Sequence, residues 1–450
     1  ARHSPHHAPI MLRLRPAKRA ETTMPYLFLR GLSHSATACI LLLLTACAEA
    51  PAQPLAAAAI APPSAAVSQP VPAAINAAPL LSFDEWRMLL RSDAIAAGID
   101  ADLFDRTFAG ITLDPKVIAA DNSQPEFTRP VWEYIDGAVS VSRIAQGRLL
   151  KAQHRPTLKA IRSTYAVDHE VLIAIWGMES NYGSNIGSHN VIRSLATLAY
   201  DGRRQVFWRT QLLAALQILQ AGDGPQQGLI GSWAGAMGQT QFMPTTFNQH
   251  AVDFDGDGHR DLWRSAPDAL ASAAHYLQAS GWQNGQPWGF EVSLPQGFDY
   301  AQADPEVRLS LAQWRAQGVT SLRAVDANEQ SPASLFLPAG HRGPAFLVLN
   351  NFRSILKYNN STAYALAIGL LSDALDGNPG VQAAWPRTDR QLGRSERIEL
   401  QELLSSKGYE PGPADGIIGA NTRKAVRAFQ QSLGLPADGY PSHELLQKLR

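Results

Sequence analysis

Cysteine is nearly absent from this 450-residue chain, which has only Cys39 and Cys47, both near the N-terminus. The rest of the sequence can form no disulfide, so its fold must depend on an apolar core. Net charge is absent as well, because 39 Lys and Arg balance 39 Asp and Glu. Six of these basic residues but only one acid lie in the first 47 residues, which leaves the remainder slightly acidic. A nucleic-acid-binding surface is therefore not expected.

Long apolar runs are lacking too. The best candidate lies within residues 24–46 and has an apolar core of roughly a dozen residues, whereas a membrane-spanning helix needs about 20. Arg30 near its start and the small residues at its end are the layout of a secretory signal. Residues before Met24 or Met11 are interpreted as a start-site extension and are excluded from the fold.

The length of the chain allows two or three domains, and 45% hydrophobic with 17% charged residues describes a folded protein. Residues 48–81 are almost entirely Ala and Pro, a composition that buries no core and favours an extended tether. A second stretch rich in Gly and Pro covers residues 376–394. The expected organisation is a signal region at 1–47, a linker at 48–81, a main domain at 82–375, a linker at 376–394 and a compact tail at 395–450.

Helical periodicity dominates the main domain. It predicts one long helix over 131–151, which carries Tyr134, and further helices over 190–200, 206–221, 263–280 and 362–375. Residues 281–348 mix Gly, Pro and short alternating runs, which predicts two to four strands. The tail predicts three helices, over 398–407, 422–433 and 442–449. Its two copies of Pro-Ala-Asp-Gly, at 413–416 and 436–439, predict equivalent tight turns.

The stretch 171–182 is the most informative part of the sequence. At helical period Leu172, Ile175, Trp176 and Glu179 share one face, so an apolar stripe ends in a carboxylate. Partial desolvation beside Trp176 raises the pKa of such a carboxyl, which suits a general acid near neutral pH. The alternative is an ordinary glutamate exposed to water at a helix end.

Two further segments have the composition of a saccharide site. Two glycines and two alanines crowd among aromatics and amides in residues 232–244, where Gln239 and Gln241 can present amides to sugar hydroxyls. Residues 350–364 are dense in Asn and Tyr, and sugar rings have apolar faces and hydroxyl rims that such side chains match. A tight structural turn explains the first segment equally well, and helix capping explains part of the second.

Residues 253–261 have the oxygen spacing of an EF-hand loop. Positions 1, 3, 5 and 9 carry carboxylates, position 6 is Gly258, and position 7 offers a backbone carbonyl. The predicted ligands are Asp253, Asp255, Asp257, the carbonyl of His259, and Asp261. Position 12 is Arg264 in place of the usual acid, so a structural Ca²⁺ is predicted to bind weakly or not at all. The alternative is a solvated acidic turn in which Asp-Gly pairs serve backbone geometry.

Several ordered motifs together resemble the lytic murein transglycosylase B family, followed by a peptidoglycan-binding domain. The resemblance covers most of residues 82–373 and nearly all of the tail. In the main domain it rests on Trp-Gly-Met-Glu-Ser-Asn-Tyr-Gly at 176–183, Ala-Gly-Ala-Met-Gly at 234–238, Gln-Phe-Met-Pro at 241–244, the loop at 253 and Lys-Tyr-Asn-Asn-Ser-Thr at 357–362. Gln239 and Thr240 depart from the family pattern, which often has an aromatic residue and Gly there.

The resemblance implies a mainly α fold with a small β region, namely a lysozyme-like helical catalytic domain plus a three-helix peptidoglycan-binding domain. It implies that Glu179 is the single catalytic acid and base and that catalysis needs no cofactor. The bond cleaved is the β-1,4 bond between N-acetylmuramic acid and N-acetylglucosamine, and the product is a 1,6-anhydromuramyl end. The sugar contacts that it implies are Ser232, Gln241, Tyr358, Asn359 and Tyr364, together with Tyr134 and Tyr276.

Leu-Thr-Ala-Cys at 44–47 resembles the bacterial lipobox, which implies lipidation of Cys47 and a periplasmic protein anchored to the outer membrane. Peptidoglycan glycan strands are the expected partner, and the chain is expected to be a monomer. The alternative is an ordinary cleaved signal.

Three other functions compete with the transglycosylase. A hydrolytic muramidase would use the same Glu179 with water, and a non-catalytic wall-binding lipoprotein would depend on the tail alone. A zinc amidase or peptidase is disfavoured because the chain has no His-Glu-x-x-His motif and only His250, His259 and His275 cluster.

Overall fold

The computed structural model describes residues 81–123, 129–225 and 227–450. The predictions for Cys47, for the signal region and for the Ala/Pro linker up to residue 80 concern the chain outside these ranges. Within them, no helix is both long and apolar enough to cross a membrane.

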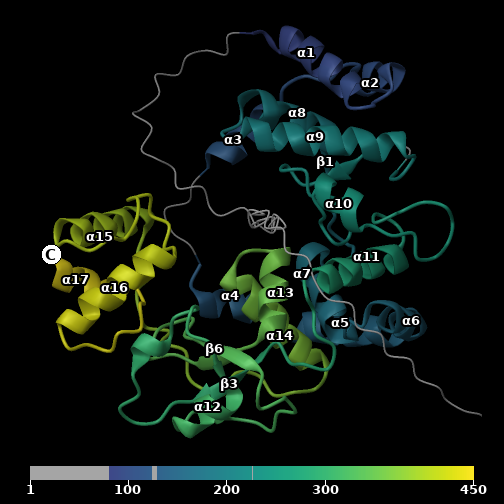
Figure 1. Cartoon of the computed structure of the whole chain (residues 1–450). Coiled ribbons are helices and arrows are strands. Elements are labelled where there is room, and N and C mark those ends of the chain that lie inside the picture. The colour runs from purple at the N-terminus through teal and green to yellow at the C-terminus, as the bar shows by residue number, and fades with distance from the viewer. Residues whose placement is uncertain (1–80, 124–128, 226) are drawn as a thin grey trace, which may run out of the picture. The chain divides into compact units, whose positions relative to one another are not determined.

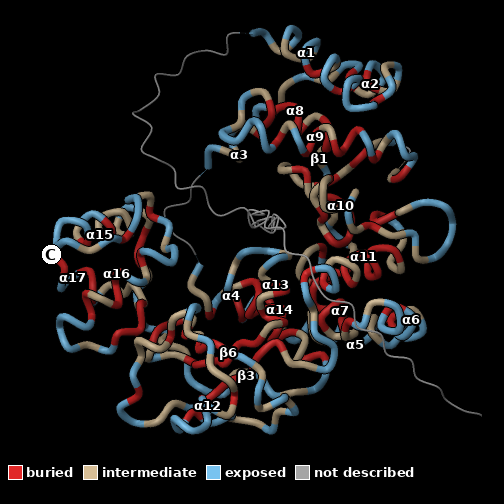
Figure 2. The backbone as a smooth tube through the Cα atoms, viewed as in Figure 1, coloured by how far each residue is buried: buried red, intermediate tan, exposed pale blue. Residues whose placement is uncertain are grey.

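Helix α7 (His169–Ser180) is the centre of the main hydrophobic core (Figure 1). It contacts α5 (Val141–Gln153), α6 (Arg155–Tyr165), α11 (Ala266–Ala279) and α14 (Thr362–Leu375). Residues 171–177 are buried without a break, as the red tube of α7 in Figure 2 shows. A helix that is apolar on nearly every side is stable in a folded protein only when other elements cover all of its faces. The helix predicted around Glu179 is thus confirmed.

A second helical layer has its own core. Helices α8 (Val191–Asp201) and α9 (Gln205–Gln220) lie side by side in Figure 1 and make extensive contact. Three N-terminal helices and one short helix complete this layer: α1 (Phe83–Ala96), α2 (Ala101–Phe108), α3 (Pro115–Asn122) and α10 (Pro244–His250). Helix α13 (Asn350–Tyr358) ends in Tyr358, which packs against both cores. The two cores therefore meet at this tyrosine.

The prediction of one helix over 131–151 is wrong. The structure has α4 (Val131–Ala138) and α5, separated at Val139 and Ser140. The cause is a capping interaction, because the Ser140 hydroxyl accepts a hydrogen bond from the amide of Arg143 at 3.3 Å and so begins a new helix. The break turns the chain while leaving Tyr134 on α4.

A small antiparallel sheet follows α11. Its strand order is β4-β6-β7-β3-β5, so five strands form where two to four were predicted. The strands are β3 (Gly289–Ser293), β4 (Leu309–Ser310), β5 (Thr320–Ser321), β6 (Pro332–Phe336) and β7 (Ala345–Val348). Trp314 on α12 (Leu311–Ala316) fills the core of this sheet and donates its indole N–H to the carbonyl of Ala333 at 2.9 Å. A separate two-stranded pair joins β1 (His189–Asn190) to β2 (Ile230–Gly231).

The tail forms a three-helix unit of α15 (Arg394–Ser406), α16 (Ala420–Ser432) and α17 (His443–Leu449) around its own core. The two Pro-Ala-Asp-Gly turns are equivalent, as predicted. Gly416 donates its amide to the side-chain oxygen of Gln401 at 2.8 Å, and Gly439 does the same to Gln430 at 2.9 Å. The predicted fold class, mainly α with a small β region and a three-helix tail, is confirmed.

Close packing around α7 can be tested at Gly177. A Cβ atom there would lie 2.7 Å from the ring of Tyr182, which is itself fixed by a hydrogen bond from its hydroxyl to the carbonyl of Arg143. Gly177→Ala is therefore expected to lower the free energy of unfolding by about 1–2 kcal/mol. Gly137→Ala in α4 is the matched control, because the nearest atom to its Cβ is 3.9 Å away. The control should gain up to about 1 kcal/mol from helix propensity. Chemical denaturation of both variants measures the difference, and equal effects would contradict this account.

Candidate active site

Glu179 lies in the last turn of α7, where the helix leaves the core. The helix ends because Asn181 and Tyr182 adopt left-handed conformations, with φ of 48° and 58°. Ser180 fixes this end, since its hydroxyl donates to the carbonyl of Gln239 at 2.6 Å and accepts from the amide of Gly183 at 2.8 Å. The glutamate is thus held on a rigid helix end.

Gln239 has a structural role that differs from the prediction. Its side-chain oxygen accepts a hydrogen bond from the indole N–H of Trp176 at 2.9 Å, and its side-chain nitrogen donates to the carbonyl of Trp263 at 3.3 Å. The residue is only 6% exposed. The hypothesis that Gln239 presents its amide to a sugar is therefore wrong, because both ends of that amide are used inside the protein.

Tyrosines surround the carboxyl group of Glu179. The hydroxyl of Tyr364, on the first turn of α14, donates to Oε1 of Glu179 at 2.5 Å. Burial raises the pKa values of Tyr134 and Tyr358, and the charge of Glu179 raises both further. These two tyrosines therefore also lie near its carboxyl group. Burial raises the pKa of Glu179 from its ordinary value of 4.5 to about 7, and the hydrogen bond from Tyr364 opposes this rise. The alternative of a glutamate in open water is thereby excluded.

The predicted tyrosines come together from four separate elements. Tyr134 is on α4, Tyr276 on α11, Tyr358 on α13 and Tyr364 on α14. The ring centroids of Tyr276 and Tyr358 are 5.2 Å apart, and their hydroxyls donate to the carbonyls of Lys357 at 2.5 Å and Thr240 at 2.6 Å. Asn359 follows directly at the end of α13 and is exposed. The tyrosines thus form an aromatic wall near the carboxyl, and Asn359 follows Tyr358 directly in the chain.

Ser232 and Gln241 belong to the turn that faces this wall. The Ser232 hydroxyl accepts from the amide of Ala236 at 3.0 Å, and the Gln241 side chain donates to the carbonyl of Gly238 at 2.8 Å. Gly238 has φ of 71°, and a Cβ there would lie 2.7 Å from Leu262. Both side chains therefore stabilise the tight turn, whether or not they also meet a ligand.

The acidic loop at 253–261 is closed by a carboxylate that lies outside the predicted ligand set. Asp268 on α11 is fully buried and accepts hydrogen bonds from the amides of Phe254, Asp255 and Asp261 at 2.8, 3.2 and 2.9 Å. Its carboxylate lies within 4.8 Å of those of Asp253 and Asp255, a spacing of oxygen atoms that fits a hard cation.

The other predicted ligands are arranged differently. Asp261 accepts from the amides of Trp263 and Arg264 and pairs with the Arg264 guanidinium at 2.7 Å, so its oxygens are used at the helix entry. Asp257 accepts from the amide of His259 at 2.9 Å. Neither carboxylate joins the group formed by Asp253, Asp255 and Asp268 in the part of the chain that the structure describes.

A half-buried carboxyl with a raised pKa, on a rigid helix end and beside tyrosines, is the geometry of a general acid. Comparison with protein families agrees with this reading. Residues 82–373 match the model described as transglycosylase SLT domain, and residues 393–449 match that of a peptidoglycan binding domain. The chain belongs to the transglycosylase SLT family. Its helical domain is therefore called the SLT domain below.

Similar proteins share both the sequence and the fold of the SLT domain. Escherichia coli membrane-bound lytic murein transglycosylase B is 32% identical over 243 residues, which are 53% of this chain and 65% of that protein. The structure of Pseudomonas aeruginosa SltB3 in complex with NAG-anhNAM-pentapeptide is 60% identical, covers 82% of this chain and 99% of the SltB3 chain, and has a TM-score of 0.80. The structure of Escherichia coli Slt35 in complex with calcium is 29% identical, covers 64% of this chain and 92% of the Slt35 chain, and has a TM-score of 0.56. The predicted lysozyme-like fold and family are confirmed.

The raised pKa of Glu179 makes the stability of the SLT domain pH-dependent. A carboxyl whose pKa is higher in the folded than in the unfolded protein stabilises the fold below the unfolded value, and that stability is lost as pH rises through the folded value. Glu179→Gln is therefore expected to raise the free energy of unfolding at pH 8 by up to roughly 3 kcal/mol, with no gain near pH 4.5.

Chemical denaturation at several pH values, followed by tryptophan fluorescence, measures this effect. Glu170→Gln is the control, because Glu170 lies on the first turn of the same helix and forms a half-exposed ion pair with Lys151 at 3.0 Å. Its loss should cost at most about 1 kcal/mol. A Glu179→Gln variant that gains nothing at pH 8 would show that the carboxyl is hydrated.

Proposed function

We propose that the chain is a peptidoglycan lytic transglycosylase in which Glu179 is the single general acid and base. The main support for this proposal is that the carboxyl group of Glu179 has a pKa of about 7 and lies among tyrosines. Burial and the Tyr364 hydrogen bond account for its pKa, and no second carboxylate of the described residues contributes to it. Glycosidases that use water or a protein nucleophile need two carboxylates flanking the bond. One carboxylate is enough where the substrate supplies its own nucleophile.

The proposed reaction moves one proton in each direction. Glu179, protonated at the start, gives its proton to the glycosidic oxygen between N-acetylmuramic acid and N-acetylglucosamine as the bond to the anomeric carbon breaks. The 6-hydroxyl of the same muramyl ring then attacks that carbon and passes its proton to Glu179. The product is a 1,6-anhydromuramyl end, no water is consumed, and the enzyme returns to its starting state. Because the nucleophile is part of the bound ring, its entropy cost is already met.

The surroundings of the Glu179 carboxyl group stabilise both of its protonation states. Burial favours the protonated acid, while the hydroxyl of Tyr364 stabilises the carboxylate that remains after proton transfer. Tyr134, Tyr276 and Tyr358 offer ring faces to sugars, and Asn359 offers an exposed amide. Ser232 and Gln241 complete the predicted sugar contacts from the glycine-rich turn. The structure of SltB3 with NAG-anhNAM-pentapeptide bound supports an anhydro product for this chain.

The place of action follows from the same proposal. Proteins similar to this chain act on murein, so we expect it at the cell wall, with Cys47 as its lipid anchor to the outer membrane.

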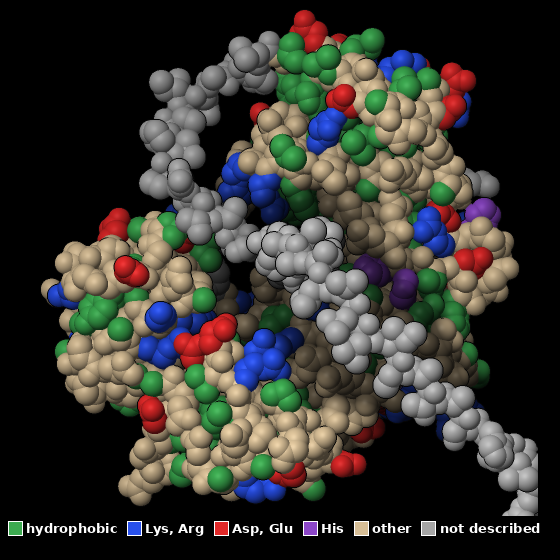
Figure 3. All heavy atoms as spheres, in the orientation of Figure 1, with side chains coloured by type: hydrophobic (Ala, Val, Ile, Leu, Met, Phe, Trp, Pro, Cys, Tyr) green, Lys and Arg blue, Asp and Glu red, His purple; other side chains and the backbone are tan. Residues whose placement is uncertain are grey.

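On the face drawn in Figure 3, basic and acidic side chains are interspersed, which is unlike a surface for nucleic acid.

Analysis of the products decides between transglycosylase and hydrolytic muramidase. Purified peptidoglycan digested by the full chain should release muropeptides with 1,6-anhydro ends when examined by mass spectrometry. Glu179→Gln should lower the rate by at least about 100-fold, because general acid–base catalysis contributes about 10²–10⁴. Reducing ends in place of anhydro ends would identify a muramidase. Undiminished solubilisation by the variant, or none by the wild type, would contradict the proposed role of Glu179.

We further propose a weak structural Ca²⁺ site formed by Asp253, Asp255 and Asp268. The calcium-bound relative and the 4.8 Å grouping support it, while the exposed Arg264 removes the usual acidic ligand. A dissociation constant of about 1 mM, typical of weak sites, predicts stabilisation by about 1.4 kcal/mol in 10 mM Ca²⁺. The melting temperature should therefore rise with Ca²⁺ for the wild type and less for Asp255→Asn. Glu444→Gln, at an exposed site on α17, should respond like the wild type. No rise at 10 mM would indicate a loop without an ion.

A further inference from the structure

A pocket of about 220 Å³ lies where the tail unit meets the SLT domain. Val131 at the start of α4 and Thr362 and Ala363 at the start of α14 line it on one side. Arg423 on α16 and Tyr440 line it on the other. Since one water occupies about 30 Å³ of liquid, the pocket has room for the end of a peptide.

The tail unit is attached beside this pocket by specific contacts. Asp438 accepts the amide of His341 at 2.8 Å, and Arg427 pairs with Asp304 at 2.5 Å. The hydroxyl of Tyr440 bonds the side chain of Gln391. The pocket walls from the two units are thereby held together.

Arg423 lines this pocket without a direct partner for its charge. Its guanidinium has no hydrogen bond and no ion pair within 4 Å to any residue that the structure describes. Burial lowers the pKa of the Arg423 guanidinium and Arg427 adds to this, whereas Tyr440 and Asp438 oppose it. The residue is half-buried, so its charge is partly withdrawn from water. Partial burial of a charge without a direct partner costs free energy, so a ligand that supplies an anion would recover part of that cost.

The rest of the pocket has the same electrostatic character. Arg397 also lines it and is held by hydrogen bonds to the carbonyls of Leu392 at 2.9 Å and Gly416 at 2.7 Å, while no Asp or Glu is among the lining residues. Thr362 and Ala363 are the first two residues of a 14-residue helix, whose N-terminal amides and dipole favour an anion. Two guanidinium groups and a helix start thus face one cavity.

The pocket is connected to the catalytic carboxyl through the same two helices. Ala363 directly precedes Tyr364, which donates to Glu179, and Val131 lies one turn before Tyr134. An extended pentapeptide spans up to about 17 Å, so a peptide attached to a sugar beside Glu179 can reach the start of α14.

We propose that this pocket binds a carboxylate of the peptidoglycan stem peptide, with Arg423 as its principal partner. The proposal rests on the proposed function for its substrate class. It assigns to the junction of the two units a specificity for glycan that carries peptide, which the sugar contacts around Glu179 alone do not provide.

Equilibrium binding tests the pocket without relying on turnover. Full-length Glu179→Gln protein is titrated calorimetrically with NAG-NAM-pentapeptide and with NAG-NAM lacking the peptide. The pentapeptide compound is expected to bind about tenfold more tightly, a ratio that fits one charge-assisted hydrogen bond. Adding Arg423→Gln should abolish this ratio and leave the affinity for the peptide-free compound unchanged. Arg423→Lys, which keeps the charge, should restore part of it.

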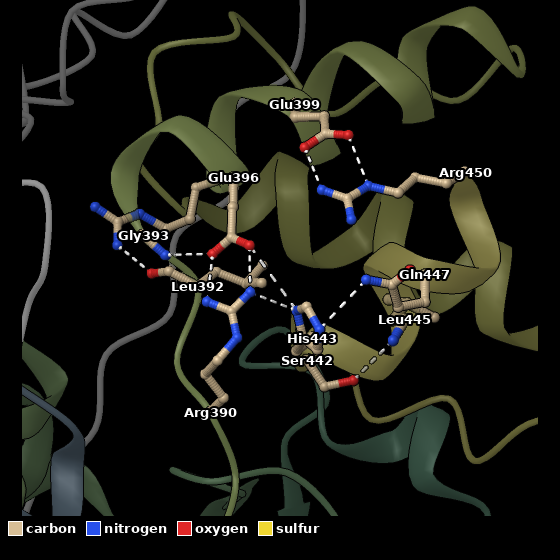
Figure 4. A network of polar contacts seen from close by, with 11 residues as sticks. Arg390, Leu392, Gly393, Glu396, Glu399, Ser442, His443, Leu445, Gln447 and Arg450 are labelled. Atoms are coloured by element: carbon tan, nitrogen blue, oxygen red, sulfur yellow. Dashed lines mark hydrogen bonds and ion pairs between the residues drawn. The ribbon is translucent and has the colours of Figure 1, made fainter.

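Arg450→Gln is the matched control. Arg450 belongs to the same unit, but it pairs with Glu399 on a separate surface beside the Arg390–Glu396–His443 network (Figure 4). It removes one positive charge and should leave the tenfold ratio intact. Equal loss of affinity for both compounds in Arg423→Gln, or a ratio that survives it, would overturn the proposal. A wild-type chain that binds both compounds but releases no anhydro product would contradict the proposed function alone.

Discussion

The partial withdrawal of one carboxyl group from water is the constraint on which the rest of the structure depends. In the proposed mechanism, Glu179 needs a low-dielectric setting to hold its proton near neutral pH, yet it must also meet a substrate. The protein meets both needs by ending α7, which is buried over residues 171–177, at the boundary between two cores. The buried helical turns of α7 hold the helix rigidly, and its last turn carries Glu179, the general acid and base of the proposed mechanism. Tyr358, which packs against both cores, marks the place where they meet.

Support for this arrangement comes from segments far apart in the chain. The indole of Trp176 is held by Gln239, and Gln239 is in turn held by Trp263, so the glycine-rich turn and the acidic loop are both tied to α7. Tyr364 reaches Glu179 across 185 residues of sequence. Two of these bonds reach α7 directly, and the third ties the glycine-rich turn to the acidic loop.

Much of this site could be predicted from the sequence, because Glu179 ends an apolar stripe and the Asn and Tyr residues cluster in one segment. The roles that could not be predicted depend on distant partners. From the sequence, Gln239 was interpreted as a possible sugar contact. Its side chain instead bonds to Trp176 and Trp263, which are 63 and 24 positions away in the chain. Asp268 lies beyond the twelve residues that an EF-hand pattern counts. The helix break at Ser140 depends on a cap whose serine is common within helices as well as at their starts.

Asp268 also bears on how the protein responds to its surroundings. Three amides of the acidic loop are already held by a side chain from the following helix, so the loop obtains its shape from the covalent chain. The neighbouring turn and the wall of the groove are then set during folding. The proposed sugar-binding surface would therefore keep its shape in hard and in soft water alike, and a Ca²⁺ ion at the proposed weak site would add stability to a loop that is already formed.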